Sequence, residues 1–467
     1  MKRILIRPLL ILLLLGIAIF CLLPYVLGFV IEQQYPKQLA KWDQPDSYQL
    51  TLMSYQRGWF TSHAIVQVFL GSANTAATSP VANLATRPSF MFKQQIKHGP
   101  FFLVKSATTK DSRLLFGLAL LNSHLDTVIG KIDSIIWVKW NGDFLGSLFS
   151  PRLQYRSPPL NLSLSQMALT WQTTRNHNYL LLDAQAPQLV LQTPHISQQA
   201  TAIKIHFQRR TQANIQSLAH NLFVKEIDWK RTDSNQLPIK LKDLQVLTQQ
   251  KQDGQKLDAS TQANVADVTI KSASYGPQQL QINVHHLDLA AFDAIKQQLI
   301  HIQNTADMSD ASTQEYQQRV RNLLSKGIEV QVSKFNLITP WGAPTLRARV
   351  TFMPQSTTNV PKQFSDLMPA MDAAVQANIP AIFLTRSLEK LYSLLMYQSA
   401  DTDAPNAIST NSVNIERATQ QQITEWVTKK WLLSKDNGYQ LNFVYKNQQG
   451  VVNGQPWTMA NTAPSLK

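Results

Sequence analysis

The sequence predicts an α+β protein that is mostly antiparallel β sheet. We expect an extended β-rich body with a few helices in its C-terminal part, preceded by one N-terminal transmembrane helix. Three observations predict this class. An uncharged run fills residues 8–31, apolar residues then recur at every second position in the first half of the chain, and helical periodicity begins only after residue 286. The regular alternation of strands and helices that builds a parallel sheet is missing.

The N-terminus predicts an uncleaved membrane anchor. Residues 8–31 would form a helix of about 36 Å, longer than the roughly 30 Å of a bilayer's hydrocarbon core. Lys2, Arg3 and Arg7 precede this run and place the N-terminus in the cytoplasm, with the remaining chain across the membrane. A cleaved signal peptide is the alternative, but its apolar region normally has only about 7–15 residues, and the candidate cleavage site at residues 26–28 is weak.

The chain therefore divides into three expected parts. Residues 1–37 hold the anchor and a short juxtamembrane segment, residues 38–285 form a β-rich region, and residues 286–467 form an α+β region that continues the same body. Cys21 is the one cysteine and lies in the anchor, which excludes a disulfide framework and a Cys-rich zinc site.

Apolar residues at period two predict strands with one apolar and one polar face, as in an antiparallel sheet. Polar turns between these strands are typical of a meander. The segments with this pattern are 48–52, 66–70, 160–164, 167–171, 203–207 and 280–284.

Helices are expected after residue 286. Residues 289–302 place their apolar side chains near one helical face, and a second helix is opened by a capping box at Ser312 and Glu315 and closed at Gly327. The remaining expected elements are strands over 328–332 and 346–352, helices over 381–397 and 414–433, a surface loop over 400–412, and hairpin strands over 439–445 and 451–452 around a turn at 447–450.

Motifs of catalysis and cofactor binding are missing. No G-x-G-x-x-G, no nucleophile elbow and no His-Glu-x-x-His occurs, and the ten histidines are scattered. We therefore assign no catalytic, cofactor-binding or metal-binding residue, expect no cofactor, and do not expect an enzyme. A metal site built from residues far apart in the sequence stays open.

The charge of the chain bears on its partners. The formal net charge is +15, from 44 Lys and Arg against 29 Asp and Glu. This excess is spread along the chain without a basic helix or an aromatic-basic platform, so nucleic acid is not an expected partner. Attraction to an anionic membrane surface and general solubility are the two interpretations that remain.

Two short clusters carry the distinctive residues. The first spans residues 55–62 and the second residues 98–101, and Arg57-Gly58 and Gly99-Pro100 have the composition of turns or bulges. A structural role is the preferred interpretation. The alternative is a ligand site with Arg57 and His98 as polar contacts, in which case the two clusters must lie close together in space.

These clusters resemble the YdgA-like family of bacterial envelope proteins, a family of unknown function. Its Tyr-x-Arg-Gly-x-Phe-x-Ser and His-Gly-Pro-Phe patterns are matched here, and residues 439–459 are similar to its C-terminal strand pair. The matching residues are Tyr55, Arg57, Gly58, Phe60, Ser62, His98, Gly99, Pro100 and Phe101. The resemblance implies a protein of the bacterial inner membrane with a β-rich periplasmic body, and it supplies no catalytic residue.

The leading hypothesis is a non-enzymatic bitopic inner-membrane protein whose periplasmic body binds or scaffolds another envelope component. The alternative is a carrier of lipid or another hydrophobic ligand along an apolar sheet groove. Its partners would be the membrane, through the N-terminal helix, and a lipid or another envelope protein. A continuous apolar groove left uncovered by helices would favour the carrier, and a filled core would favour the binding module.

Overall fold

The structure is a computed structural model that describes residues 22–40, 48–70, 89–105, 112–127, 129–231, 238–271, 273–305, 309–355, 361, 363–399 and 408–457. The chain forms two compact units, unit 1 (Met1–Arg210) and unit 2 (Thr211–Lys467). Both units consist mostly of antiparallel sheet, and unit 2 also contains the α-helices between residues 289 and 428. The predicted fold class is confirmed in this respect.

The N-terminal helix is described from residue 22 to residue 40. Residues 1–21 lie outside the described part, and with them Cys21 and the cations that set the predicted topology. No helix in the described residues is long and apolar enough to span a bilayer. The transmembrane anchor is therefore a prediction that this structure does not support. The C-terminal part of this helix belongs to the folded body, because Tyr35 and Leu39 are buried in the core of unit 1.

Unit 1 is an antiparallel meander in which each strand pairs with the next one named. Its core holds Ala64, Val66, Ile96 and Leu121 on the sheet face that packs against the helix over residues 22–40. A separate two-stranded sheet of β4 (Phe101–Lys105) and β5 (Ser112–Phe116) is inserted between the third and fourth strands of the meander. The meander strands are β1 (Tyr48–Gln56), β2 (Thr61–Leu70), β3 (Ser89–His98), β6 (Ala119–Thr127), β7 (Gly130–Val138), β8 (Phe144–Ser157), β9 (Leu160–Thr173), β10 (Tyr179–Gln192) and β11 (Ile196–Gln212).

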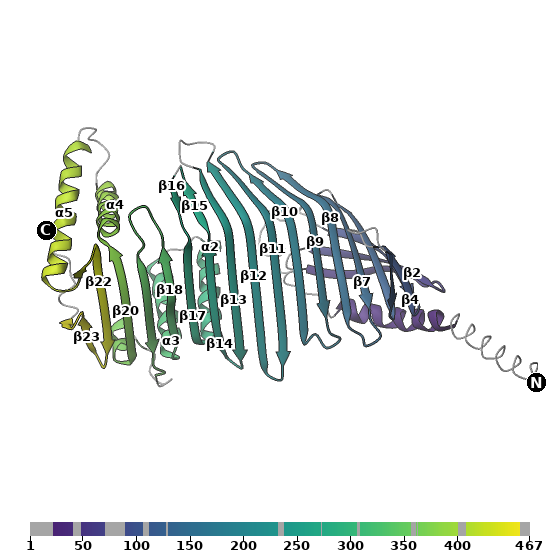
Figure 1. Ribbon diagram of the computed structural model, residues 1–467. Coiled ribbons are helices and arrows are strands. Elements are labelled where there is room, and N and C mark those ends of the chain that lie inside the picture. Colours follow the sequence, from purple (N-terminus) through teal and green to yellow (C-terminus); the bar gives the residue numbers. More distant parts are fainter. Residues whose placement is uncertain are drawn as a thin grey trace, which may run out of the picture. The chain divides into compact units, whose positions relative to one another are not determined.

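Unit 2 is also antiparallel, with helices between some of its strands (Figure 1). The paired strands, in order, are β12 (Ile215–Arg231), β13 (Ile239–Asp253), β14 (Lys256–Val265), β17 (Gln278–Asp288), β18 (Glu329–Leu337), β19 (Thr345–Phe352), β20 (Met371–Pro380), β22 (Gly438–Lys446), β23 (Gln449–Val452) and β24 (Gln455–Trp457). Three short strands extend this sheet, with β15 (Asp267–Ile270) on β13, β16 (Ala273–Tyr275) on β15 and β21 (Leu433–Lys435) on β22.

Three helices of unit 2 match predicted ones with small shifts, the last lies five to six residues before its predicted range, and the 3-10 helix was not predicted. They are α2 (Leu289–Thr305), α3 (Asp310–Ser325), the 3-10 helix η2 (Phe364–Ala370), α4 (Ala381–Ser399) and α5 (Ile408–Thr428). The predicted cap of α3 was wrong by one turn: Ser309, not Ser312, is the N-cap, and its side chain accepts from the backbone N–H of Ser312. Gly327 follows this helix with φ +88°, as a left-handed C-terminal position requires.

Two loops also differ from their expected bounds. Residues 400–407 of the expected surface loop lie outside the described part, and the rest was wrong because α5 already begins at Ile408. The final hairpin closes with the two residues Asn447 and Gln448, both at positive φ, and not over four residues. Two left-handed residues suit the twist of a tight hairpin better than a longer turn does.

Candidate functional site

The two sequence clusters lie side by side in unit 1, against the helix over residues 22–40. The turn between β1 and β2 carries the first cluster, and β3 ends at the second. The backbone N–H of His98 donates to the carbonyl oxygen of Phe60 at 2.7 Å, which joins the two clusters directly. We call the residues of both clusters, together with the helix residues they contact, the motif site.

Arg57 is held by the helix. Its guanidinium forms an ion pair with Glu32 at 3.3 Å and lies over the rings of Tyr25, at 5.0 Å, and Phe29, at 5.5 Å. Trp59 packs its ring on Tyr25 with 5.0 Å between centroids. Exposed ion pairs contribute little, whereas a cation over two aromatic faces adds both attraction and packing. Arg57 therefore fastens the helix to the β1–β2 turn.

His98 fills the space beside a glycine of the helix. Its side chain is only 4% exposed, and a Cβ built at Gly28 would lie 2.6 Å from its Nδ1 atom. Burial lowers the pKa of His98; the Trp59 backbone opposes this shift and the charge of Arg57 adds to it. Within the described residues, neither ring nitrogen has a hydrogen-bond partner of good geometry. The imidazole is therefore neutral at pH 7 and acts as a packing group.

The glycines of the motif site serve two different purposes. Gly99 has φ +134°, a backbone conformation that favours glycine, and it lies against the buried Pro24 of the helix. A Cβ at Gly58 would collide with the carbonyl oxygen of Thr61, and its φ is not in the left-handed region. Close approach of the backbone accounts for Gly58, and conformation accounts for Gly99.

The remaining residues of the two patterns surround this contact. Tyr55 packs on Tyr35 of the helix at 5.7 Å between ring centroids, and burial raises the pKa of its hydroxyl. Ser62 is fully buried. The carbonyl oxygen of Pro100 accepts a hydrogen bond from the backbone N–H of Gly117 at 3.1 Å. Phe60 and Phe101 are each about half exposed. The sequence clusters thus do lie together, and what they hold in this structure is the helix.

A second candidate site is the apolar face of the sheet in unit 2. Cross-strand pairing places Leu222, Val246, Ala263, Leu280 and Phe335 in one row across β12, β13, β14, β17 and β18. All five side chains are only half-buried.

The helices of unit 2 cover only one end of this face. α2 and α3 pack where Leu257, Val284 and Leu287 lie, whereas α4 packs on β20 and β22. Figure 1 shows α2 and α3 near β17 and β18, whereas β12 and β13 have no helix beside them. Among the described residues of β12, β13 and β14, Val224 is the one buried apolar side chain. The middle of this face therefore has no covering layer in the described part of the chain.

The long strands of unit 1 also keep their apolar residues on one face. A kink in these strands makes this possible, and the sequence patterns did not reveal it. Pro151, Gln166, Pro187 and Ala202 stand opposite one another on β8 to β11, and Gln166 and Ala202 have φ of 45° and 48°. On each side of this row the apolar residues recur at every second position, but the two series are offset by one residue. Residues 160–164 and 167–171, expected as two strands, are therefore one strand, β9, with a kink.

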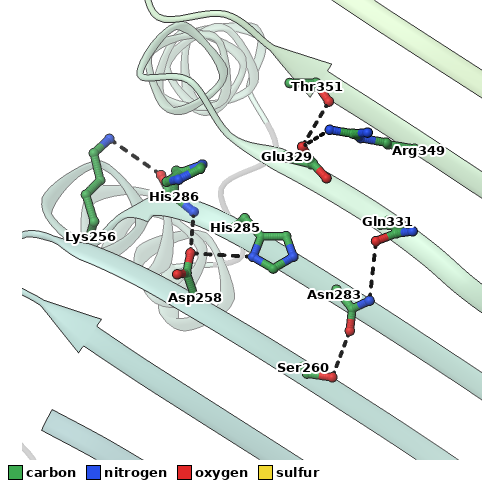
Figure 2. A network of polar contacts seen from close by, with 10 residues as sticks. All are labelled: Lys256, Asp258, Ser260, Asn283, His285, His286, Glu329, Gln331, Arg349 and Thr351. Carbon is green, nitrogen blue, oxygen red and sulfur yellow. Dashed lines mark hydrogen bonds and ion pairs between the residues drawn. The ribbon is translucent and has the colours of Figure 1, made fainter.

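The opposite face of the unit 2 sheet is polar. Figure 2 shows Ser260, Asn283 and Gln331 in a row across three strands, where Ser260 Oγ donates to Asn283 at 2.7 Å and the Asn283 amide donates to Gln331 at 3.5 Å. At the strand ends, Arg349 donates to Glu329 at 2.8 Å. Burial alone would raise the pKa of Glu329, but the hydrogen bond and charge of Arg349 lower it overall. These side-chain hydrogen bonds join adjacent strands on the polar face of the sheet.

Metal and acid–base sites were sought on the same faces. In the part of the chain that the structure describes, no group of three or more His, Cys, Asp and Glu could hold a metal ion. His285 lies 3.7 Å from Asp258, whose carboxylate also accepts from the backbone N–H of His286 (Figure 2). These groups are largely exposed, and no ligand contact follows from them.

The comparison with family models assigns the chain. Residues 7–460 match DUF945, described as a bacterial protein of unknown function. The chain belongs to this family. The match includes the uncharged run and both sequence clusters. The comparisons with curated proteins and with solved structures gave no match.

Proposed function

We propose that this DUF945 protein is a bitopic protein of the bacterial inner membrane that binds the acyl chains of lipids along the apolar face of its periplasmic sheet. In this proposal residues 8–31 are a retained anchor with a cytoplasmic N-terminus. The resemblance of the clusters to the YdgA-like family and the charge pattern of the N-terminus support this placement. The lipid carrier replaces the scaffold as the leading hypothesis.

The observation that carries the proposal is the half-buried apolar row from Leu222 to Phe335 with no covering layer in the described residues. Five strands at about 4.8 Å spacing give a strip of about 19 Å. Each leaflet's chains extend about 15 Å, so one acyl chain fits across the strip. Covering it would release about 0.8 kcal/mol for each methylene removed from water.

The test uses photocrosslinking in the intact cell. A benzoylphenylalanine replaces Phe335 on the apolar face. In a matched control chain it replaces the neighbouring Asn336, which pairs with Gln279 and therefore lies on the polar face. After irradiation, mass spectrometry identifies the adducts. Lipid adducts at Phe335 and few at Asn336 are expected. Protein adducts without lipid at Phe335 would overturn the carrier and favour the scaffold.

A further inference from the structure

We infer that the β4–β5 hairpin is a membrane-docking element whose outer face enters the interface of an anionic lipid bilayer. This surface is separate from the apolar face of unit 2 and goes beyond the proposed lipid binding, because docking requires no lipid to leave the membrane.

One face of the hairpin exposes four large apolar side chains. Phe101 pairs with Phe116 and Leu103 with Leu114, so these four side chains share one side. Their exposed fractions are 50%, 53%, 65% and 69% in that order. The other side is occupied as well, because Phe102 is buried. A hairpin on the surface of a water-soluble body normally presents polar residues outward, whereas this one is apolar on both sides.

Aromatic rings extend this face beyond the hairpin. Phe101 packs on Phe116 at 5.1 Å between centroids, and Phe116 packs on Trp140 at 5.4 Å. Trp140 is itself exposed. Aromatic side chains with one wet and one apolar end are enriched where a bilayer meets water.

The position of the hairpin in the chain indicates the bilayer as the occupant. β4 begins two residues after Gly99, which lies against Pro24 near the start of the described helix. Leu22, Val26 and Phe29 on that helix are exposed, and the uncharged residues 8–21 come directly before it. Docking at this depth rests on the anchor of the proposed function: if about 20 residues of the run cross the hydrocarbon core, the core ends near residue 27, and Gly99 at the start of the hairpin lies within about one helical turn of its outer edge.

The charge of the hairpin fits an anionic surface. Among the described residues, β4 carries Lys105 and β5 carries Arg113, and neither strand carries an anion. Cations next to an anionic bilayer are attracted to its surface. Docking at this point would hold unit 1 at the membrane by two elements, the anchor and the hairpin.

The test measures the depth of a fluorescent label in the full chain. Cys21→Ser removes the one native cysteine. A single cysteine is then introduced by Leu103→Cys or Leu114→Cys, or by Ile382→Cys of α4 as a similarly exposed control. Each cysteine receives an environment-sensitive nitrobenzoxadiazole label. The proteins are reconstituted in phosphatidylcholine vesicles with and without phosphatidylglycerol, each also containing spin-labelled lipids. Labels at residues 103 and 114 should lose more than half of their emission, with less quenching when phosphatidylglycerol is absent, and the label at 382 should keep its emission.

Two results would overturn the inference. Equal quenching at 103, 114 and 382 would show that the hairpin does not dock, and equal quenching at 103 and 114 in both vesicle types would remove the role of the cations. The label on native Cys21 in the unaltered chain reports on the anchor separately. Quenching at Cys21 alone would retain the anchor and refute the docking hairpin. The photocrosslinks at Phe335 are independent of both labels.

Discussion

The packing of His98 against Gly28 predicts a measurable conflict when a single methyl group is added. Gly28→Ala places a Cβ 2.6 Å from His98 Nδ1 and 2.8 Å from its Cε1. The imidazole has little freedom to move away, because it is buried and its backbone N–H is bonded to Phe60. Overpacking of this kind costs about 1–3 kcal/mol. Alanine in a helix gains about 1 kcal/mol over glycine. The net expectation is a loss of between about 0 and 2 kcal/mol.

A second background separates the two effects. His98→Ala removes the ring, so Gly28→Ala in that background retains the helical gain and avoids the collision. We expect the sign of its effect to change from destabilising to stabilising, with a coupling of about 1–3 kcal/mol between the two positions.

The assay is thermal unfolding of the four full-length proteins in one detergent, followed by tryptophan fluorescence. For a unit of this size about 1 kcal/mol corresponds to a shift of roughly 2–4 °C in Tm. If Gly28→Ala shifts Tm equally in both backgrounds, the helix does not pack on His98 as described.

Three further predictions concern charges. The pKa of His98 is lowered in the folded state, so as pH falls the unfolded chain binds the proton first. The free energy of unfolding should therefore fall as pH drops below about 6.5. Urea titrations at pH 7 and 5 should show this loss in the native chain and less of it in His98→Gln. The pKa of Glu329 is lowered, so its contribution is present above its unfolded value and lost as pH falls below it; Arg349→Met should flatten the acid limb of the stability profile, and an unchanged limb would contradict the pairing. Arg57→Gln should cost about 1 kcal/mol, mostly from the lost contact with the aromatic rings, so added salt should remove only a small part of the effect.

The sequence by itself located some of the strands and most of the helices. Period-two alternation located strands such as β1 and β17, and helical periodicity located α2 to α5, because each depends on neighbours within about one turn or one strand. The cap at Ser309 and the kink at Gln166 were missed. Capping depends on one hydrogen bond of about 1 kcal/mol, and the kink is visible only when its row of partners on the adjacent strands is known.

The motif site was predictable as a set of residues but not as an arrangement. Arg57 and His98 stood out in the sequence, yet nothing in it showed that both contact the helix over residues 22–40, which was read only as part of a membrane anchor. The exposed hairpin face was hidden for the same reason, since an apolar strand such as 101–105 looks alike in sequence whether its partner is protein or lipid. Local periodicity fixes which side chains share a face. Which face is covered, and by what, depends on segments far apart in the chain, so only the tertiary structure decided it.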